Sequence, residues 1–223
     1  MKKSRSEKIL DAAREIFLSR GYHATAMDAI ASRAGYSKRT IYLDYDNKDA
    51  LFIRVGVGGL EILVERLRTV PQEGAGIEEV VNGLLEVVFE FSRQNGDYLR
   101  VFFAEATPDI VANCPERLRR RLAGLERTIL GMVAAQVERA IEGGVIAPTD
   151  PWEAAGIFIG SVMGIILLSM AGSQTVYSRQ TLDSMARKAA WLIWRGMYAD
   201  NPAMKGDELL GRRASASPPG AEA

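Results

Sequence analysis

A short segment rich in hydrogen-bond donors, Ser-Lys-Arg-Thr-Ile-Tyr, occupies residues 37–42 of this 223-residue chain. Lysine and arginine carry cationic donors that suit phosphate oxygens, and arginine also matches the acceptor edge of guanine. The hydroxyl groups of serine, threonine and tyrosine add neutral donors for phosphates and base edges. Such side chains suit contact with a nucleic acid if their neighbours hold them together on one exposed helix.

The residues around this run predict two short helices joined by a tight turn. We expect Thr25 to begin the first helix, with Asp28 completing a capping box. That helix should stop at Gly35, where glycine takes a positive φ without strain. A small residue, Ala31, lets the second helix cross closely, and Ile41 fills the junction. This is the geometry of a helix-turn-helix, whose second helix enters the major groove of DNA.

Charge is distributed unevenly along the chain although the formal net charge is zero. Residues 1–43 hold nine lysines and arginines against four aspartates and glutamates, an excess of five positive charges that the remainder balances. This excess favours a polyanionic partner for the N-terminal part. A solvated charged surface is the simpler interpretation of charge alone. The charge excess therefore adds support to the helix-turn-helix motif, and the motif is the main evidence for DNA binding.

Cysteine and histidine are too few for most catalytic and metal sites. Cys114 and His23 are the single residues of their types, which excludes a Cys/His zinc site and a disulfide framework within the chain. A catalytic pair of Cys114 and His23 is geometrically possible from the sequence. The sequence has no G-x-S-x-G motif and no phosphate-binding glycine loop that would indicate an enzyme. We expect no enzymatic activity, no cofactor and no metal, and a reducing cytoplasm as the location.

Helix signals recur along the chain, whereas strand signals are weak. From residue 201 the composition turns to Gly, Ser, Pro and Ala, which predicts a disordered tail over 201–223. The sequence thus predicts an all-α fold, with a helix-turn-helix domain over 1–50 and a larger ligand-sensing and dimerisation domain over 51–200. About nine helices are expected, over residues 6–20, 25–34, 38–43, 48–67, 77–94, 97–106, 116–142, 152–171 and 178–198.

The N-terminal residues share a pattern with a known family. The matching residues are Ile9, Ala12, Ala13, Phe17, Gly21, Thr25, Ile30, Ala31, Ala34, Gly35, Ser37, Tyr42, Tyr45, Lys48 and Leu51. In this pattern the chain resembles the TetR-type (tetracycline-repressor-like) transcriptional regulators, specifically over about residues 5–55 and only in architecture beyond them. The sequence departs from the pattern at Tyr36, usually a small aliphatic residue, and at Asp44, usually a phosphate-contacting residue. We expect Asp44 to turn away from DNA or to cap a helix locally.

The resemblance implies a dimer that binds double-stranded DNA at a palindromic operator, most commonly as a repressor. Thr25, Tyr42 and Lys48 would contact phosphates, and Lys38, Arg39 and Thr40 are the residues that we expect to reach bases. For each of them the alternative is a surface residue, or for Tyr42 half-buried packing. The predicted DNA-binding residues are Thr25, Ser37, Lys38, Arg39, Thr40, Tyr42 and Lys48.

An uncharged apolar stretch from Ala154 to Gly172 is about as long as a bilayer span. A membrane-anchored helical interaction protein is therefore the alternative function. Serine and glutamine residues in and after the stretch, and the lack of a flanking basic cluster, favour a buried helix and no membrane. The resemblance implies that the last two long helices pair across a homodimer axis. The predicted interface residues are Gly156, Gly160, Gly164, Leu182, Met185, Ala189, Leu192 and Ile193.

Aromatic and methionine side chains on the middle helices are numerous enough to enclose a small molecule. Residues of this kind at helical spacing are more often plain core. Few polar residues accompany them, which favours an uncharged or lipophilic effector. The predicted pocket residues are Phe89, Phe102, Phe103, Asn113, Gln136, Trp152, Phe158 and Met163.

Overall fold

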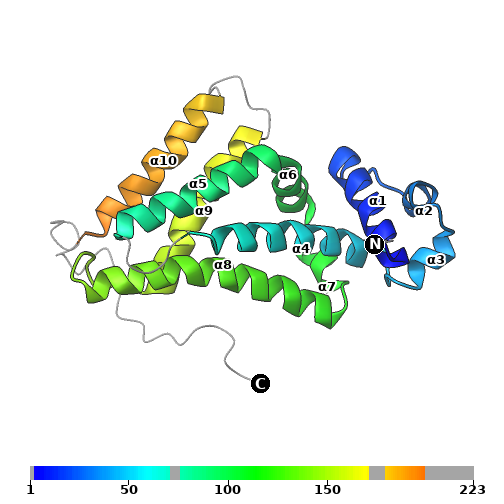
Figure 1. Ribbon diagram of the computed structural model, residues 1–223, viewed down its shortest axis with the longest axis horizontal. Helices are drawn as coiled ribbons and strands as arrows, with labels where there is room; N and C mark the ends of the chain where they lie inside the picture. The colour runs from blue at the N-terminus through cyan, green and yellow to red at the C-terminus, as the bar shows by residue number, and fades with distance from the viewer. Residues whose placement is uncertain (1–2, 71–75, 171–178, 199–223) are drawn as a thin grey trace. The chain divides into compact units, whose positions relative to one another are not determined.

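The structure, a computed structural model, describes residues 3–70, 76–170 and 179–198, and these form helices with no named strand (Figure 1). The predicted all-α fold is confirmed. The helices are α1 (Arg5–Arg20), α2 (Met27–Ala34), α3 (Lys38–Tyr42), α4 (Lys48–Leu67), α5 (Ile77–Gln94), α6 (Gly96–Glu105), α7 (Pro108–Ala112), α8 (Glu116–Glu142), α9 (Pro151–Met170) and α10 (Arg179–Gly196).

The described residues therefore hold ten helices where about nine were predicted, and the additional one is α7. Its residues were expected in a loop because prolines flank them. Thr107 caps α7 by accepting a hydrogen bond from the backbone N–H of Ile110, and Pro108 stands in the first turn, where a missing N–H is harmless. The predicted tail over 201–223 lies outside the described residues.

Contacts divide the chain into two compact units, which we describe separately. The first unit comprises Met1–Thr69 and Val87–Arg127, and the second comprises Val70–Glu86 and Thr128–Ala223. Helix α4 belongs to the same unit as α1–α3, so the predicted functional boundary at residue 50 lies inside the first unit.

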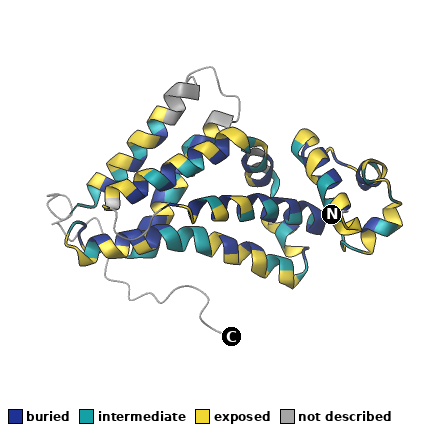
Figure 2. Cartoon of the chain, viewed as in Figure 1, coloured by how far each residue is buried: buried dark blue, intermediate teal, exposed yellow. Residues whose placement is uncertain are grey.

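The core of the first unit is built on α1 and α4. Helix α1 buries Ile9, Ala13 and Phe17, and the Phe17 ring meets the Phe52 ring edge-on at 5.2 Å between centroids. Helix α4 is buried along most of its length (Figure 2). Edge-to-face aromatic packing adds to the area that these helices bury, so α1 is fixed firmly against α4.

Helix α6 crosses α4 at two glycines. A Cβ atom at Gly56 would overlap the ring of Phe102, and one at Gly59 would lie 2.5 Å from Cδ1 of Tyr98. The absence of side chains at these two positions is what lets the aromatic rings rest on the α4 backbone.

In the second unit α9 and α10 pack against each other, and both keep an exposed apolar face. Ala155 and Phe158 of α9 are buried, whereas Ile157 is 54% exposed. Trp191 and Leu192 of α10 are 60% and 62% exposed. The apolar surface of this pair therefore exceeds what the second unit itself covers.

Candidate DNA-binding interface

The two short helices of the predicted helix-turn-helix are present. Helix α2 ends at Gly35, which has φ +73°, and α3 begins after Ser37, whose hydroxyl oxygen accepts a hydrogen bond from the backbone N–H of Thr40. Ile41 is fully buried and anchors α3 against the other helices. The glycine turn, the serine cap and the single apolar anchor thus fix α3 as an exposed helix of little more than one turn.

The start of α2 differs from the prediction. Ala26 is the N-cap and makes no side-chain hydrogen bond, so the predicted capping box of Thr25 and Asp28 is wrong. The Thr25 side chain is buried, and its hydroxyl donates a hydrogen bond of 2.6 Å to the carbonyl oxygen of Gly21. A hydroxyl that is shielded and already bonded does not reach a phosphate, so we remove Thr25 from the predicted contacts.

The remaining predicted residues of α3 lie at its surface. Lys38, Arg39 and Ser37 are exposed, Tyr42 is 44% exposed, and Thr40 is half-buried. The hydroxyls of Ser37 and Thr40 lie 2.8 Å apart and share a hydrogen bond. Cationic and hydroxyl donors therefore lie along one short helix, as the sequence indicated.

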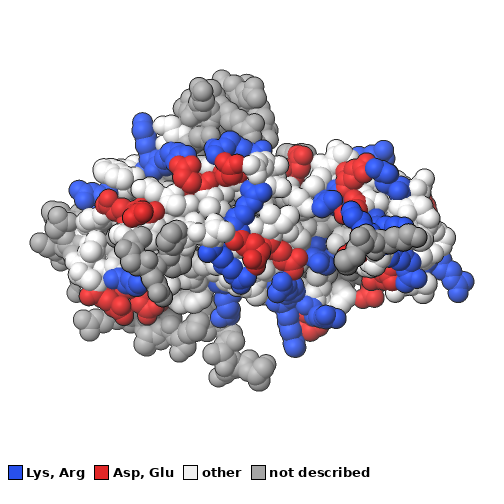
Figure 3. Space-filling view, viewed as in Figure 1, with Lys and Arg blue, Asp and Glu red and all other residues white. Residues whose placement is uncertain are grey.

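Ion pairs reduce the positive charge that the sequence places in this region. Nζ of Lys38 lies 3.1 Å from Oδ2 of Asp28, and Arg33 pairs with Glu15 at 2.6 Å. Basic and acidic side chains are accordingly interspersed over the N-terminal helices (Figure 3). Arg39 has no acidic partner in the part of the chain that the structure describes, which makes it the most available cation of α3.

Asp44 is engaged by Arg5 of α1. Nε and Nη2 of Arg5 lie 2.9 Å and 2.5 Å from the two carboxylate oxygens of Asp44, and this bidentate pair lowers the pKa of the carboxyl. The sequence predicted that Asp44 turns away or caps a helix. The arginine partner neutralises the acid instead, which removes the conflict with a nearby phosphate.

Lys48 stands at the first position of α4, where backbone N–H groups also favour anions. Its Nζ lies 4.1 Å from the centroid of the Tyr22 ring, a cation–π contact, and partial burial lowers its pKa. The lysine is half-buried, so it is partly available to a phosphate near the N-terminus of α4.

A hydrogen-bond network that the sequence did not reveal joins these residues to α6 and α7. The Glu105 carboxylate accepts a hydrogen bond from the backbone N–H of Tyr22, and the Tyr22 hydroxyl donates to Asp49. The second carboxylate oxygen of Asp49 accepts from Nδ2 of Asn113 at 2.9 Å, and the Asn113 carbonyl accepts from Nδ2 of Asn47 at 3.0 Å. These hydrogen bonds connect the loop before α2 and the start of α4 to the end of α6 and the end of α7.

The predicted pocket residues are divided between the two units and serve mostly in packing. Phe102 rests on Gly56, Asn113 belongs to the network above, and Phe103 is 47% exposed. The first unit contains a cavity of about 620 Å³, and none of the eight residues lines it. Those in the first unit are Phe89, Phe102, Phe103 and Asn113; those in the second are Gln136, Trp152, Phe158 and Met163.

Cys114 and His23 do not form a catalytic pair. Cys114 is buried, burial raises the pKa of its thiol to about 11, and the thiol hydrogen-bonds to the Ile110 carbonyl oxygen at 3.3 Å. His23 is exposed and packs edge-on against Tyr22, 5.1 Å between ring centroids. A thiol that stays protonated near neutral pH is a poor nucleophile.

Comparison with known families agrees with this geometry. The family model described as "Bacterial regulatory proteins, tetR family" matches residues 9–55, which span α1 to the first part of α4. Residues 9–55 therefore form a DNA-binding domain of the TetR-family type. The chain is accordingly a TetR-like transcriptional regulator, and α3 is the second helix of its helix-turn-helix.

Relatives extend the similarity beyond the TetR domain. The uncharacterized HTH-type transcriptional regulator YhgD of Bacillus subtilis is 27% identical over 162 residues, covering 73% of this chain and 82% of YhgD. The HTH-type transcriptional activator FasR of Mycolicibacterium smegmatis is 32% identical over 99 residues, 44% of this chain and 45% of FasR.

Among solved structures, the transcriptional regulator FadR from Bacillus subtilis in complex with stearoyl-CoA has a TM-score of 0.67 to this chain. The two are 21% identical, and the match covers 86% of this chain and 98% of FadR. The likeness covers most of the chain and supports the all-helical fold of the described residues.

Proposed function

We propose that this TetR-family regulator is a homodimeric repressor in the cytoplasm that binds a two-fold symmetric operator through α3 and leaves it when a small apolar ligand binds. The observation that carries the proposal is the exposed pair of cations, Lys38 and Arg39, on a helix anchored by the buried Ile41. Such a helix projects donors outward while its position is held from beneath, which is what groove recognition requires.

Each exposed donor suits a different contact. Arg39 is free of an acidic partner among the described residues and its fork matches O6 and N7 of guanine. Lys38 would leave Asp28 to bind DNA, and the half-buried Thr40 would offer a hydroxyl donor. Ser37, Tyr42 and Lys48 suit phosphates, which position the protein without specifying sequence.

The dimer rests on the exposed face of α9 and α10. A Cβ atom added at Gly156, Gly160 or Gly164 would meet no atom within 4 Å, and all three glycines are exposed. Leu192 is exposed as well, and a second copy packed on this face would cover it together with the glycines. Met185, Ala189 and Ile193 are half-buried, and the Leu182 side chain lies outside the described residues.

A membrane span is the alternative explanation for the same surface. In the described chain one helix, over Pro151–Leu168, is long and apolar enough to cross a bilayer by length and composition, and 28% of this window is buried within the chain. We favour the dimer because the exposed apolar residues continue onto α10, whose Arg187 and Lys188 are charged and exposed. A symmetric dimer also supplies the two α3 helices, about 34–36 Å apart, that a palindromic operator needs.

The effector is proposed on chemical grounds and by analogy. FadR, which shares this fold, was crystallised with stearoyl-CoA, a ligand with a long apolar chain. Five of the eight predicted pocket residues are aromatic and two, Asn113 and Gln136, are polar, which suits an apolar effector. Such a ligand would release DNA only if it binds better to the conformer whose two α3 helices are misplaced.

The network of Glu105, Tyr22, Asp49 and Asn113 is the proposed route between ligand and DNA. It ties α6 and α7 to the loop before α2 and to the start of α4. A shift of α6 on ligand binding would therefore move the helix-turn-helix with it, because Glu105 holds the loop backbone directly.

DNA binding through α3 is tested with Arg39→Ala and a matched control, Arg93→Ala, which removes an exposed arginine of α5. If Arg39 reads a base, its loss weakens operator binding by about 1–3 kcal/mol in a gel-shift titration and relaxes specificity. Lys48→Ala should weaken all duplexes alike and reduce the salt slope by about one. Unchanged affinity and specificity in Arg39→Ala would refute the assignment of α3.

The dimer is tested by analytical ultracentrifugation at micromolar concentration. Gly160→Leu should shift the protein toward monomer, because a leucine side chain would separate the two copies. Gly124→Leu is the control, since Gly124 is also an exposed helical glycine with open space around its Cβ position. A wild-type protein that sediments only as monomer would refute the dimer.

A further inference from the structure

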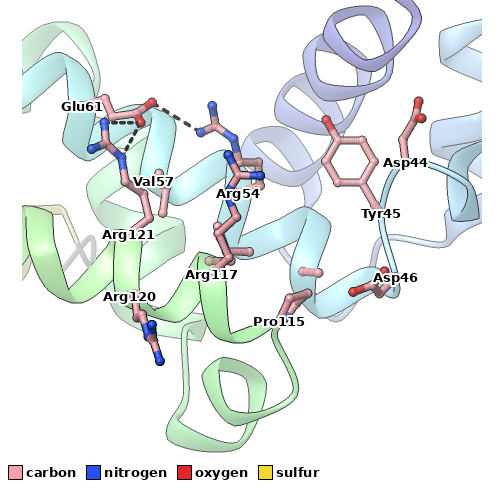
Figure 4. A pocket seen from close by; sticks show the side chains of 12 residues that line it. Asp44, Tyr45, Asp46, Arg54, Val57, Glu61, Pro115, Arg117, Arg120 and Arg121 are labelled. Atoms are coloured by element: carbon pink, nitrogen blue, oxygen red, sulfur yellow. Dashed lines mark hydrogen bonds and ion pairs between the residues drawn. The ribbon is translucent and has the colours of Figure 1, made fainter. Parts of the chain in front are cut away.

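The first unit contains a cavity of about 620 Å³ between the segment after α3, helix α4 and the start of α8 (Figure 4). Its wall combines the apolar side chains of Val57 and Leu118 with four arginines. This volume is in the range of small-molecule sites in proteins, about 300–1,000 Å³. The arginines are Arg54 of α4 and Arg117, Arg120 and Arg121 of α8.

The arginine side of the cavity carries more positive charge than its neighbours neutralise. Glu61 is shared by two guanidinium groups, those of Arg121 at 2.9 Å and Arg54 at 3.4 Å. Arg117 has no ion-pair partner within the described ranges 3–70, 76–170 and 179–198. One carboxylate therefore faces three guanidinium groups, which leaves an excess of about two positive charges.

The remaining charges of the wall do not cancel this excess. Arg120 is paired with Glu116 at 2.6 Å. Asp44 is neutralised by Arg5, which lies outside the cavity. Asp46 makes no ion pair or side-chain hydrogen bond with the described residues, and Figure 4 places it on the side opposite Arg121. The cavity thus has a cationic end on α4 and α8.

We propose that this cavity binds a small organic phosphate, with Arg54, Arg117 and Arg121 holding the phosphate group and Pro115 and Leu118 contacting the organic part. Guanidinium forks match phosphate oxygens bidentately, and three of them suit a dianion better than a carboxylate. An inorganic phosphate alone would leave most of the cavity unfilled. The site is separate from the apolar effector of the proposed function and does not depend on it.

The preference of the cavity for phosphate over carboxylate is tested by isothermal titration calorimetry of the full-length protein with inorganic pyrophosphate at low ionic strength. We expect one site per subunit, and we expect succinate, a dicarboxylate, to bind at least several-fold more weakly. Succinate binding as tightly as pyrophosphate, or no pyrophosphate binding, would overturn the proposal.

Three variants locate the site. Arg117→Gln should weaken pyrophosphate binding about tenfold, because a hydrogen bond to a charged group is lost and no ion pair inside the protein is broken. Glu61→Gln should strengthen it about three- to fivefold, because the shared carboxylate no longer competes for Arg54 and Arg121. Arg93→Gln, outside the cavity, should leave it unchanged. A Glu61→Gln variant that binds pyrophosphate more weakly would contradict the charge argument.

DNA backbone is the other phosphate that could meet these arginines. In the same set of proteins, Arg117→Gln should retain wild-type affinity for duplex DNA. A loss of duplex affinity equal to the loss of pyrophosphate affinity would overturn the small-molecule site in favour of a DNA contact.

Discussion

The ion pair between Asp28 and Lys38 makes a specific prediction about DNA affinity. Lys38 is exposed on α3 but its ammonium group lies 3.1 Å from the Asp28 carboxylate. A lysine that moves to a phosphate or base must leave this partner, and the carboxylate it leaves behind repels the DNA. Replacing Asp28 by asparagine should therefore tighten DNA binding, the opposite of what most substitutions in a binding surface do.

The magnitude follows from the exposure of the pair. The Lys38 and Asp28 side chains are 47% and 72% exposed, so the pair is screened by solvent and is worth at most about 1 kcal/mol. A carboxylate about 7 Å from one phosphate in water adds about 0.6 kcal/mol of repulsion. Because Lys38 gains a DNA contact in both proteins, the two terms together predict affinity about three- to fifteenfold higher for Asp28→Asn.

Asp28 also lies in the first turn of α2, where a negative charge interacts favourably with the helix dipole and stabilises the helix. Its loss should reduce the free energy of unfolding by about 0.3–1 kcal/mol. This change is measured separately by thermal unfolding, and it does not alter DNA affinity while the protein remains folded.

The assay is fluorescence anisotropy of a labelled duplex at several salt concentrations. Glu65→Gln is the matched control, because Glu65 pairs with Arg68 on α4 with exposures of 70% and 57% and the net charge changes equally. The gain in Asp28→Asn should exceed that in Glu65→Gln and shrink as salt rises. Equal gains in both variants, or weaker binding by Asp28→Asn, would refute the reasoning.

Further predictions concern packing and titration in the first unit. Gly56→Ala should destabilise the protein in thermal unfolding, because the added Cβ would overlap Phe102. Gly58→Ala should stabilise it by about 0.5–1 kcal/mol, because the nearest atom to its added Cβ, Arg54 Nη1, is 4.0 Å away. The reverse order of stability would contradict the packing of α6 on α4. Cys114, with a pKa of about 11 from burial, should react with a disulfide reagent at pH 8 far more slowly in the native protein than in denaturant. Burial raises the pKa of Tyr22 to about 12, so its contribution to stability is complete below about pH 10 and is lost as the pH rises toward 12; urea midpoints of Tyr22→Phe should lack that part of the alkaline decline.

Local signals predicted the helix ends where one residue decides the conformation. Gly35 has a positive φ, and the side chains of Ser37 and Asn47 cap α3 and α4 as expected of such residues. The same reasoning failed at Thr25, because its hydroxyl bonds back to Gly21 and the helix starts after Ala26. Helix α7 has a local signal, Thr107 before Pro108, but the prolines that flank this segment favoured a loop.

Contacts between distant residues could not be predicted from the sequence. Arg5 and Asp44 are 39 positions apart, and Glu105 meets Tyr22 across 83 positions. Neither spacing carries a periodic or motif signal, because the contact depends on how α1 and α6 pack. For the same reason the predicted pocket residues could be recognised as apolar but could not be assigned to one cavity, and Arg117 could not be recognised as part of one.

The most direct test of the central claim is selection of binding sites from random or genomic duplexes by the purified protein at low ionic strength. We expect an enriched two-fold symmetric motif with half-sites about one helical turn, 34–36 Å, apart, and loss of that enrichment in Arg39→Ala. A wild-type protein that enriches no duplex, or an Arg39→Ala protein that enriches the same motif equally well, would contradict it.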